Sequence, residues 1–404
     1  MSKISTITAV DVGTDSIKVI IAKKSPDGVG FDVLGKAENI SSGMKNGGVK
    51  DIEKVAKDIK RTVAEAEREA GVSVEDVYVN INGSHLFSLT SKATITTSHN
   101  QEKITKEDVD RVINEAKIFS ISPNKEILVT IPKEYVVDDE KGIRDPVGLS
   151  GVRLSAEIVA IGGFLSYSKW LTEALLEADI QGINEFVIDP IAAAEAVLSE
   201  QEKELGVIAV NFGAATTGIA VYKNEDLLFI KVIPVGVHNI RNDIAVGLKI
   251  DVEAADFIRN KFSGSIFKDK STKKEVVKIA EDDEVVFYRN ELRKIVEARV
   301  GEIFEAIKEE IEKVAPIKDF PGGVVLTGGG AKIPNIKDYA RNKIGLSCRI
   351  GKPKRFFNLD EDPSYSTLCG LVLWGAEAEE EMEKKINFKG FSGLIKKMLR
   401  PLLP

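Results

Sequence analysis

Two stretches of the chain, 200 residues apart, carry the same order of apolar and polar positions. Residues 7–24 (ITAVDVGTDSIKVIIAKK) consist of an apolar β-branched run, a polar turn with glycine and threonine, and a second apolar run. Residues 207–224 (VIAVNFGAATTGIAVYKN) repeat this order, with Asn211 at the position of Asp11. Two apolar runs separated by a short polar turn are typical of a β-hairpin. The sequence therefore predicts a duplicated fold with one hairpin in each half.

The elements after each hairpin also correspond. A third strand is predicted at residues 31–37 in the first half and at residues 226–236 in the second. A helix is predicted over residues 51–70, because apolar residues recur there at helical spacing between glycines. Each half is then interrupted: residues 84–160 alternate strand patterns around one helix, and residues 237–320 are mostly charged and helical. The pattern therefore predicts two cores, each with an inserted unit.

The last part of the chain has a different pattern. An acidic stretch (EAEEEMEKK) is predicted to be a solvated linker, and NFKGFSGLIKKMLRPLLP follows it. In this final segment apolar residues recur on one helical face with basic residues beside them, which is typical of a helix lying at a membrane surface. A terminal helix docked on the core is the alternative. The predicted membrane-binding residues are Phe388, Phe391, Leu394, Ile395, Lys396, Lys397, Met398, Leu399 and Arg400.

Composition narrows the classes of protein that fit. Of the 404 residues, 43% are hydrophobic and 29% are charged, which is ordinary for a folded soluble protein. The net charge of −7 argues against general nucleic-acid binding. Cys348 and Cys369 have no CxxC spacing, so we expect neither a disulfide framework nor a zinc site. Without an apolar run of 18 residues, we expect no signal peptide or transmembrane helix.

The two hairpin turns carry residue types that bind phosphate. Facing each other across a cleft, they would resemble the phosphate clamp of the actin-like ATPase superfamily, in which backbone N–H groups of both turns surround a nucleotide. Asp11 ends a strand and could hold a water bound to Mg²⁺, while Gly13 and Thr14 offer N–H and hydroxyl donors. Lys18 is placed either to reach the β-phosphate or to lie in solvent. The run Gly328–Gly330 lacks Cβ atoms and would allow a purine and its ribose to approach closely.

The predicted nucleotide site therefore combines both turns with the later glycine run. It comprises Asp11, Gly13, Thr14, Asp15, Lys18, Asn211, Gly213, Ala214, Ala215, Thr216, Gly328, Gly329 and Gly330.

Five further motifs resemble the FtsA family of bacterial cell-division proteins and stand in the family's order. They are GMKNGGVKDIEKV (Gly43 to Val55), IPKEY (Ile131 to Tyr135), DPVGLSGVRL (Asp145 to Leu154), GGVVLTGGGAKI (Gly322 to Ile333) and PSYSTLCGL (Pro363 to Leu371). The third is the most specific, because it lies in the inserted unit that separates this family from actin, sugar kinases and heat-shock chaperones.

The resemblance implies an α/β fold of the actin-like (ribonuclease H-like) type, duplicated into two lobes. Four subdomains named IA, IC, IIA and IIB follow from it. The expected boundaries are 1–83 and 161–203 for IA, 84–160 for IC, 204–236 and 321–376 for IIA, 237–320 for IIB, 377–387 for the acidic linker, and 388–404 for the amphipathic helix.

The resemblance also implies ligands and partners. These are ATP with Mg²⁺, the C-terminal peptide of the tubulin-like protein FtsZ, other copies of the chain in a head-to-tail filament, other divisome proteins, and anionic lipid. Glu253 resembles the family's ribose-contacting acid. Candidates for binding the acidic FtsZ peptide are Arg289, Arg293, Lys294 and Arg299, each of which could equally belong to a solvated charged face.

The second turn departs from the superfamily pattern. Asn211 and Gly218 stand where the superfamily commonly has aspartates, and Ala214 and Ala215 replace glycines. Asparagine cannot take a proton from water or bind Mg²⁺ with a full charge. We therefore expect conditional ATP binding and at most a very slow ATPase, with no catalytic residue assigned.

The function expected from the sequence is a filament-forming adaptor that binds adenine nucleotide between its lobes. It would attach FtsZ filaments to the cytoplasmic face of the cell membrane at the division site. Two alternatives remain open at this stage: an active ATPase or sugar kinase of the same superfamily, and an adaptor of type IV pilus assembly similar to PilM.

Overall fold

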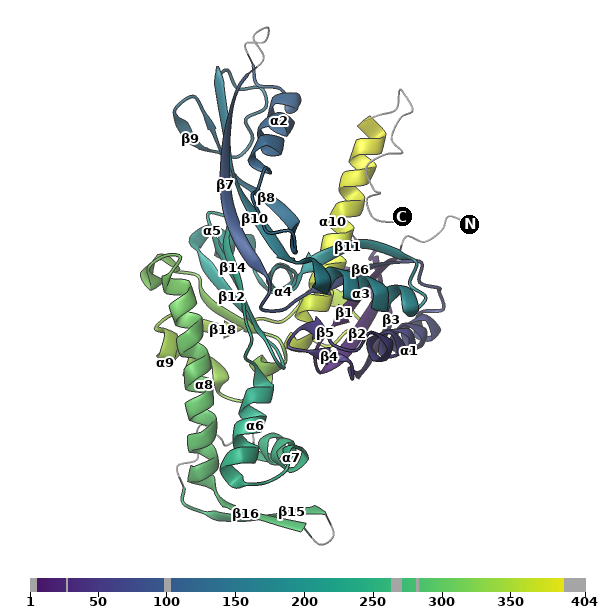
Figure 1. Cartoon of the computed structure of the whole chain (residues 1–404), viewed down its shortest axis with the longest axis vertical. Coiled ribbons are helices and arrows are strands. Elements are labelled where there is room, and N and C mark those ends of the chain that lie inside the picture. The colour runs from purple at the N-terminus through teal and green to yellow at the C-terminus, as the bar shows by residue number, and fades with distance from the viewer. Residues whose placement is uncertain (1–5, 27, 98–102, 263–270, 281–282, 389–404) are drawn as a thin grey trace.

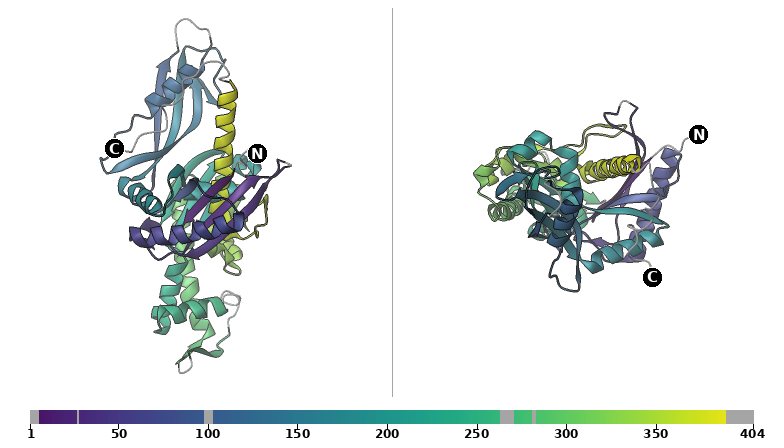
Figure 2. Two further views of the ribbon diagram at one scale, coloured as in Figure 1. Left: turned by 90° about the vertical axis from the view of Figure 1, so that its right-hand side faces the viewer. Right: turned by 90° about the horizontal axis from the view of Figure 1, so that it is seen from above.

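The computed structural model describes residues 6–26, 28–97, 103–262, 271–280 and 283–388. It is an elongated molecule in which two sheet-containing lobes lie side by side and an inserted unit extends from each end of the long axis (Figure 1). The left view of Figure 2 again shows the two inserted units at opposite ends of the molecule.

The first lobe is built on a six-stranded mixed sheet. Its central strands alternate apolar residues between two faces, as a half-buried strand requires. Val10 and Val12 pack toward α1 and α3, while Ile7 and Ala9 pack toward α4 and α10. The strand order is β11 (Gly182–Ile188), β6 (Asp76–Ile81), β1 (Ile7–Val12), β2 (Ser16–Lys24), β3 (Phe31–Ile40) and β19 (Phe356–Phe357), with α1 (Ile52–Ala70) and α3 (Leu165–Glu177) covering one face. A short hairpin, β4 (Met44–Lys45) and β5 (Gly48–Val49), precedes α1.

The second lobe repeats this plan with five strands. The register of its hairpin matches that of the first: Asn211 pairs with Gly218 as Asp11 pairs with Lys18. The predicted duplicated hairpins are therefore confirmed. The strand order is β14 (Asp226–Ile233), β13 (Thr217–Lys223), β12 (Val207–Phe212), β17 (Gly323–Thr327) and β18 (Cys348–Ile350), with α9 (Ile336–Ile344) packed beside β18.

Two helices lie between the sheets and join the lobes. They are α4 (Asp189–Val197) and α10 (Ser366–Phe388), and a short helix, α5 (Glu200–Leu205), follows α4. Helix α10 contacts β1, β2 and β6 of the first lobe, while α4 contacts β12, β13 and β17 of the second. The two helices cross closely, because a Cβ built on Gly370 would lie 1.8 Å from the backbone oxygen of Ala192.

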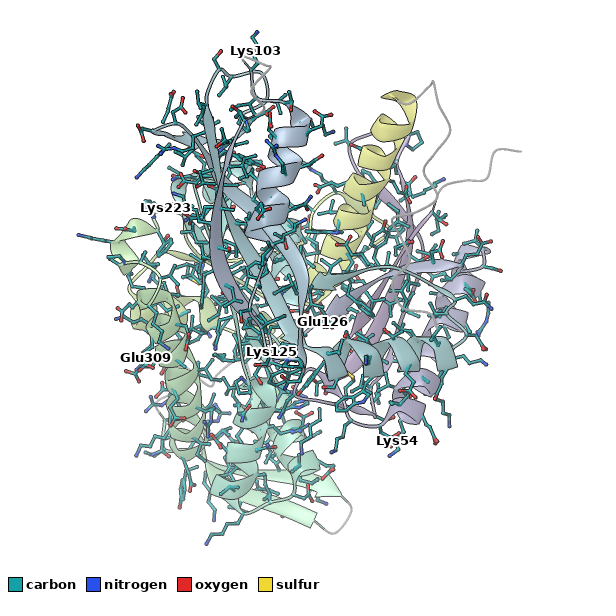
Figure 3. The ribbon with its side chains drawn as sticks, turned by 45° about the horizontal axis from the view of Figure 1, so that its top comes forward. Lys54, Lys103, Lys125, Glu126, Lys223 and Glu309 are labelled. Atoms are coloured by element: carbon teal, nitrogen blue, oxygen red, sulfur yellow. The ribbon has the colours of Figure 1, made fainter. Side chains whose placement is uncertain are left out.

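The unit inserted in the first lobe is a four-stranded sheet with one helix. Its order is β7 (Phe87–Thr96), β10 (Arg153–Phe164), β8 (Lys125–Val137) and β9 (Glu140–Ile143), with α2 (Lys106–Ala116) packed on one face. Lys103 lies at its outer end, whereas Lys125 and Glu126 lie where it meets α3 (Figure 3).

The unit inserted in the second lobe contains more than the predicted charged helices. It holds helices α6 (Val237–Leu248), α7 (Val252–Phe262) and α8 (Arg289–Glu312), and a hairpin of β15 (Lys274–Ala280) and β16 (Asp283–Tyr288) lies between α7 and α8 in the chain. The prediction of a mostly helical unit missed this hairpin. Its strands contain only short apolar runs, VV, IA and VVF, among charged residues, so their signal was weak.

The C-terminal helix also differs from the expectation. Residues 377–387, predicted to be an acidic linker, continue α10 without a break to Phe388. Glutamate and lysine are good helix formers, and this stretch has no glycine or proline that would end the helix. Residues 389–404, which carry the predicted membrane-binding residues after Phe388, lie outside the described part of the chain. Within the described residues, no helix combines the length and apolar character that crossing a bilayer requires.

Candidate functional site

A cavity of about 420 Å³ lies between the lobes. Both hairpin turns line it, together with residues from α6 and α7 and the glycine run Gly328–Gly330. Thirteen of the residues predicted to bind nucleotide therefore come together; they are Asp11, Gly13, Thr14, Asp15, Lys18, Asn211, Gly213, Ala214, Ala215, Thr216, Gly328, Gly329 and Gly330. Such a concave site between lobes is a common place for a small-molecule ligand.

The two turns have the same internal construction. The backbone N–H of Gly13 donates to the carbonyl of Ser16 over 3.1 Å, and that of Gly213 donates to Thr216 over 2.9 Å. A Cβ on either glycine would lie within 2.8 Å of that same carbonyl oxygen. Both N–H groups thus close their own turns. Contacts to a phosphate therefore fall to the other residues of the turns.

A buried polar network joins the turns beneath the cavity. The side-chain amide of Asn80 donates to Asp11 over 2.7 Å and to Asp189 over 3.3 Å. The amide of Asn211 donates to the other oxygen of Asp189 over 2.7 Å, and to the hydroxyl of Thr367 over 3.1 Å. Asp11 is therefore linked to Asn211 through Asn80 and the carboxylate of Asp189, the first residue of α4.

Both carboxylates of this network favour the protonated form or a nearby cation. Burial raises the pKa of Asp11 to about 7. The positive charge of Lys18 lowers this pKa, and the negative charge of Asp189 raises it. Burial likewise raises the pKa of Asp189. A divalent cation would compensate this charge, and Mg²⁺ commonly binds one or two carboxylates together with waters and phosphate oxygens. Asp11 and Asp189 thus fit Mg²⁺, although the described residues contain no group of three or more metal-binding side chains.

Lys18 does not lie in solvent. Only 8% of this residue is exposed, and its Nζ donates to the carbonyl oxygen of Ser364 over 2.9 Å. Its Nζ also lies 3.7 Å from a carboxylate oxygen of Glu38 and 5.3 Å from the ring centre of Tyr365. The lysine reaches the cavity, and its charge is already partly balanced there.

The glycine run forms the wall of the cavity in the second lobe. Gly328 has a φ of 81°, and a Cβ on it would lie 2.3 Å from the Asn211 side-chain oxygen. A Cβ on Gly330 would meet the ring of Phe212 at 2.5 Å, whereas one on Gly329 would meet nothing within 4 Å. Gly329 therefore marks the point where a ligand can approach the backbone most freely.

Helix α7 lines the opposite wall with residues other than the predicted one. Asp256, Arg259 and Asn260 line the cavity, and Arg259 donates to Asp256 over 2.7 Å. Glu253 is exposed, one turn earlier on the helix, and is not among the lining residues. The structure therefore does not bring Glu253 together with the other predicted site residues.

The candidate FtsZ-binding residues lie on α8, which packs beside α6 (Figure 1), and none of them lines the cavity. Arg289, Arg293 and Arg299 are paired with carboxylates of Glu275, Glu297 and Asp243 at 2.5 to 2.7 Å. Lys294 is exposed and lines a shallow surface pocket that also includes Gly247, Thr272, Tyr288, Asn290, Glu291 and Ile295.

Several lining residues were missed at the sequence level. They are Asn80, Asp189, His238, Arg241, Arg259, Ser364 and Thr367. A usable signal existed for Asp189, because it directly follows a strand and precedes Pro190 at the start of a helix. The others come from separate elements that only the folded topology brings together.

Comparison with solved structures places the fold. The PilM–PilN type IV pilus biogenesis complex matches with a TM-score of 0.67 at 15% identity, covering 92% of this chain and 99% of that one. MreB5 of Spiroplasma citri bound to ADP matches with a TM-score of 0.58 at 13% identity, covering 94% and 98%. The fold and the cavity thus define a two-lobed protein of the actin-like class.

Sequence comparison identifies the family within that class. Residues 83–161 match the SHS2 domain inserted in FtsA, and residues 208–370 match cell division protein FtsA. FtsA of Bacillus subtilis (strain 168) is 32% identical over 94% of this chain and 86% of its own length. FtsA of Escherichia coli (strain K12) is 31% identical over 94% of both chains. The chain belongs to the FtsA family of cell division proteins.

Proposed function

We propose that the protein binds adenine nucleotide in the interlobe cavity. The observation that carries this proposal is the pair of equivalent turns, closed by Gly13 and Gly213, that line one cavity from opposite lobes. A phosphate chain between the turns contacts both lobes at once. Nucleotide then stabilises lobe closure to the extent that it binds the closed arrangement more tightly.

The residues divide this task by their chemistry. Polar groups of the two turns face the phosphates, and Lys18 adds positive charge beside them. Gly329 leaves room for the purine and ribose. Asp11 and Asp189 would hold Mg²⁺ through water, and the ion when bound would neutralise phosphate charge. Asn211 cannot act as a general base, so hydrolysis is very slow.

Calorimetric titration with ATP and Mg²⁺ tests this proposal. Saturable binding with one nucleotide per chain is expected, together with little phosphate release in a parallel assay. Absence of binding would contradict the nucleotide function. Turnover of several per second would instead indicate an active ATPase, despite Asn211 and Gly218 in place of the aspartates of the second turn.

We further propose that the chain polymerises and attaches FtsZ filaments to the cytoplasmic face of the cell membrane, together with other divisome proteins. The C-terminal peptide of FtsZ binds the second inserted unit, where Lys294 offers an exposed charge beside a shallow pocket. At Arg289, Arg293 and Arg299, acidic groups of that peptide compete with internal carboxylates. The segment after Phe388 binds anionic lipid, and many such segments on one filament bind far more firmly than one.

A further inference from the structure

Helix α6 presents two basic side chains to the cavity. His238 and Arg241 are three residues apart, so they lie on one face of the helix, and both line the cavity. The helix begins directly on the second turn: the N–H groups of Val237 and His238 donate to the carbonyls of Gly213 and Ala214 over 3.1 and 2.7 Å. The basic face is therefore fixed relative to the turn that lies beside the phosphates.

Arg241 has hydrogen-bonding capacity that the described residues do not use. Its Nε is buried and makes no hydrogen bond within the described part of the chain. A buried guanidinium N–H without a partner is unfavourable, and charge-assisted hydrogen bonds to phosphate are among the strongest that arginine makes. Arg241 is thus suited to an anion within the cavity.

The other basic residues of the cavity already have partners. Lys18 donates to Ser364, Arg259 pairs with Asp256 at 2.7 Å, and Lys332 pairs with Asp362 at 2.5 Å. Of these lining bases, Arg241 therefore has the charge most directly available to a ligand, and His238 lies beside it on the same helix.

One anion of the opposite lobe reaches this pair. Asp15, in the first turn, has a carboxylate oxygen 3.0 Å from Nε2 of His238. This hydrogen bond and the charges of His238, Arg241 and Arg259 lower the pKa of Asp15, so the carboxylate is ionised at neutral pH. Asp15 thus contributes negative charge to a turn that would otherwise attract phosphate, and it links the two lobes.

We propose that His238 and Arg241 form a polyphosphate-binding pair in the cavity and that Asp15 competes with the phosphate chain for this pair. The inference rests on the nucleotide function proposed above. A bound polyphosphate takes over the contacts of the pair and separates Asp15 from His238. The interlobe link of the protein is thereby exchanged for a link through the ligand.

The test is calorimetric titration of the full chain with ATP and Mg²⁺ and, in a separate experiment, with inorganic tripolyphosphate in magnesium-free buffer. Asp15→Asn should tighten both ligands by about two- to fivefold, because it removes a partly exposed competing charge. Arg241→Gln should weaken both by about tenfold, because it removes a charge-assisted contact to phosphate. Arg241→Lys keeps the positive charge and should therefore reduce both affinities by less than Arg241→Gln does.

Matched controls come from outside the cavity. Asp139→Asn changes a highly exposed acid paired with Arg153, and Arg61→Gln changes an exposed base on α1; neither should alter either affinity. Weaker or unchanged binding by the Asp15→Asn variant would overturn the inference, as would unchanged binding by a folded Arg241→Gln variant.

The two ligands separate this inference from the nucleotide function. If tripolyphosphate follows the expected order among the variants while ATP does not bind, the pair stands and the nucleotide function is wrong. If ATP binds equally to all variants, the nucleotide function stands and the pair is wrong. Failure of both ligands to bind would overturn both.

Discussion

A single histidine fixes the point where the first inserted unit leaves its lobe. His85 has its ring centre 3.7 Å from that of Tyr167, its Nδ1 accepts from the N–H of Phe164 over 3.3 Å, and its Nε2 donates to the carbonyl of Asn82 over 3.1 Å. This arrangement requires a neutral ring, because a protonated Nδ1 would face another N–H group. Burial accordingly lowers the pKa of His85 to about 4.

The free energy of unfolding should therefore depend on His85 in mild acid. Below about pH 6.5 the unfolded chain takes up a proton at this residue that the folded chain takes up only near pH 4. Neutral His85 therefore contributes at most about 3 kcal/mol to the free energy of unfolding. This contribution is fully present above pH 6.5 and is lost as the pH falls toward 4. Urea unfolding of the wild type and His85→Asn between pH 7 and 4.5 would measure this, and the variant should show a shallower decline. Equal slopes would contradict the assignment.

At the same scale, sequence reasoning found the residues whose role follows from local chain geometry. Asp11, the two turn glycines and Gly328–Gly330 belong to strand ends and turns that adjacent residues specify. Asn80 and Thr367 could not be found in this way, because they are ordinary polar residues until the fold brings them to Asp189. Glu253 was taken from the family resemblance, and its place on α7 leaves it outside the cavity lining.

Among the elements, α4 and α10 determine how the lobes are held. Gly370 allows the backbones of the two helices to touch where they cross. A Cβ at this position would lie 1.8 Å from the carbonyl oxygen of Ala192 and 2.4 Å from its carbonyl carbon. Backbone atoms cannot move aside as the end of a side chain can, so a larger residue would push the helices apart.

Gly370→Ala should therefore lower the free energy of unfolding by about 3 kcal/mol, the upper range for overpacking a core. The matched control is Gly329→Ala, where an added Cβ meets nothing within 4 Å and stability should change little. Both can be measured by urea unfolding. A loss below about 1 kcal/mol at Gly370 would show that the crossing relaxes easily.

The element-level predictions succeeded where the apolar pattern was long. The hairpins of each lobe and α1 followed from continuous periodicity, and α1 ends at Gly71 with a φ of 69°. The hairpin β15–β16 was missed because its apolar runs are short, although Val277, Val285 and Phe287 are buried in the core of the second lobe. Residues 377–387 were called a linker from charge alone, although their helix propensity is high.

At the scale of the whole molecule, membrane attachment depends on the segment that follows α10. Deleting residues 388–404 should leave a folded protein that no longer sediments with anionic liposomes, because the apolar face and the bases Lys396, Lys397 and Arg400 are removed. Each base near an anionic surface contributes about 1 kcal/mol. Liposome sedimentation with and without anionic lipid measures this, and Leu394→Glu should reproduce the loss without shortening the chain. Continued sedimentation of the deletion variant would assign membrane binding to another part of the molecule.

Helix α10 runs from the polar network beneath the cavity to the start of the segment proposed to bind lipid. Thr367, in the first turn of α10, hydrogen-bonds Asp189 and Asn211 beneath the cavity, and the 23 residues of the helix give it a length of about 35 Å. A tilt of about 5° at its base would displace its far end by about 3 Å over that length. A small rotation of the helix at the interlobe network would therefore produce a larger sideways displacement at Phe388.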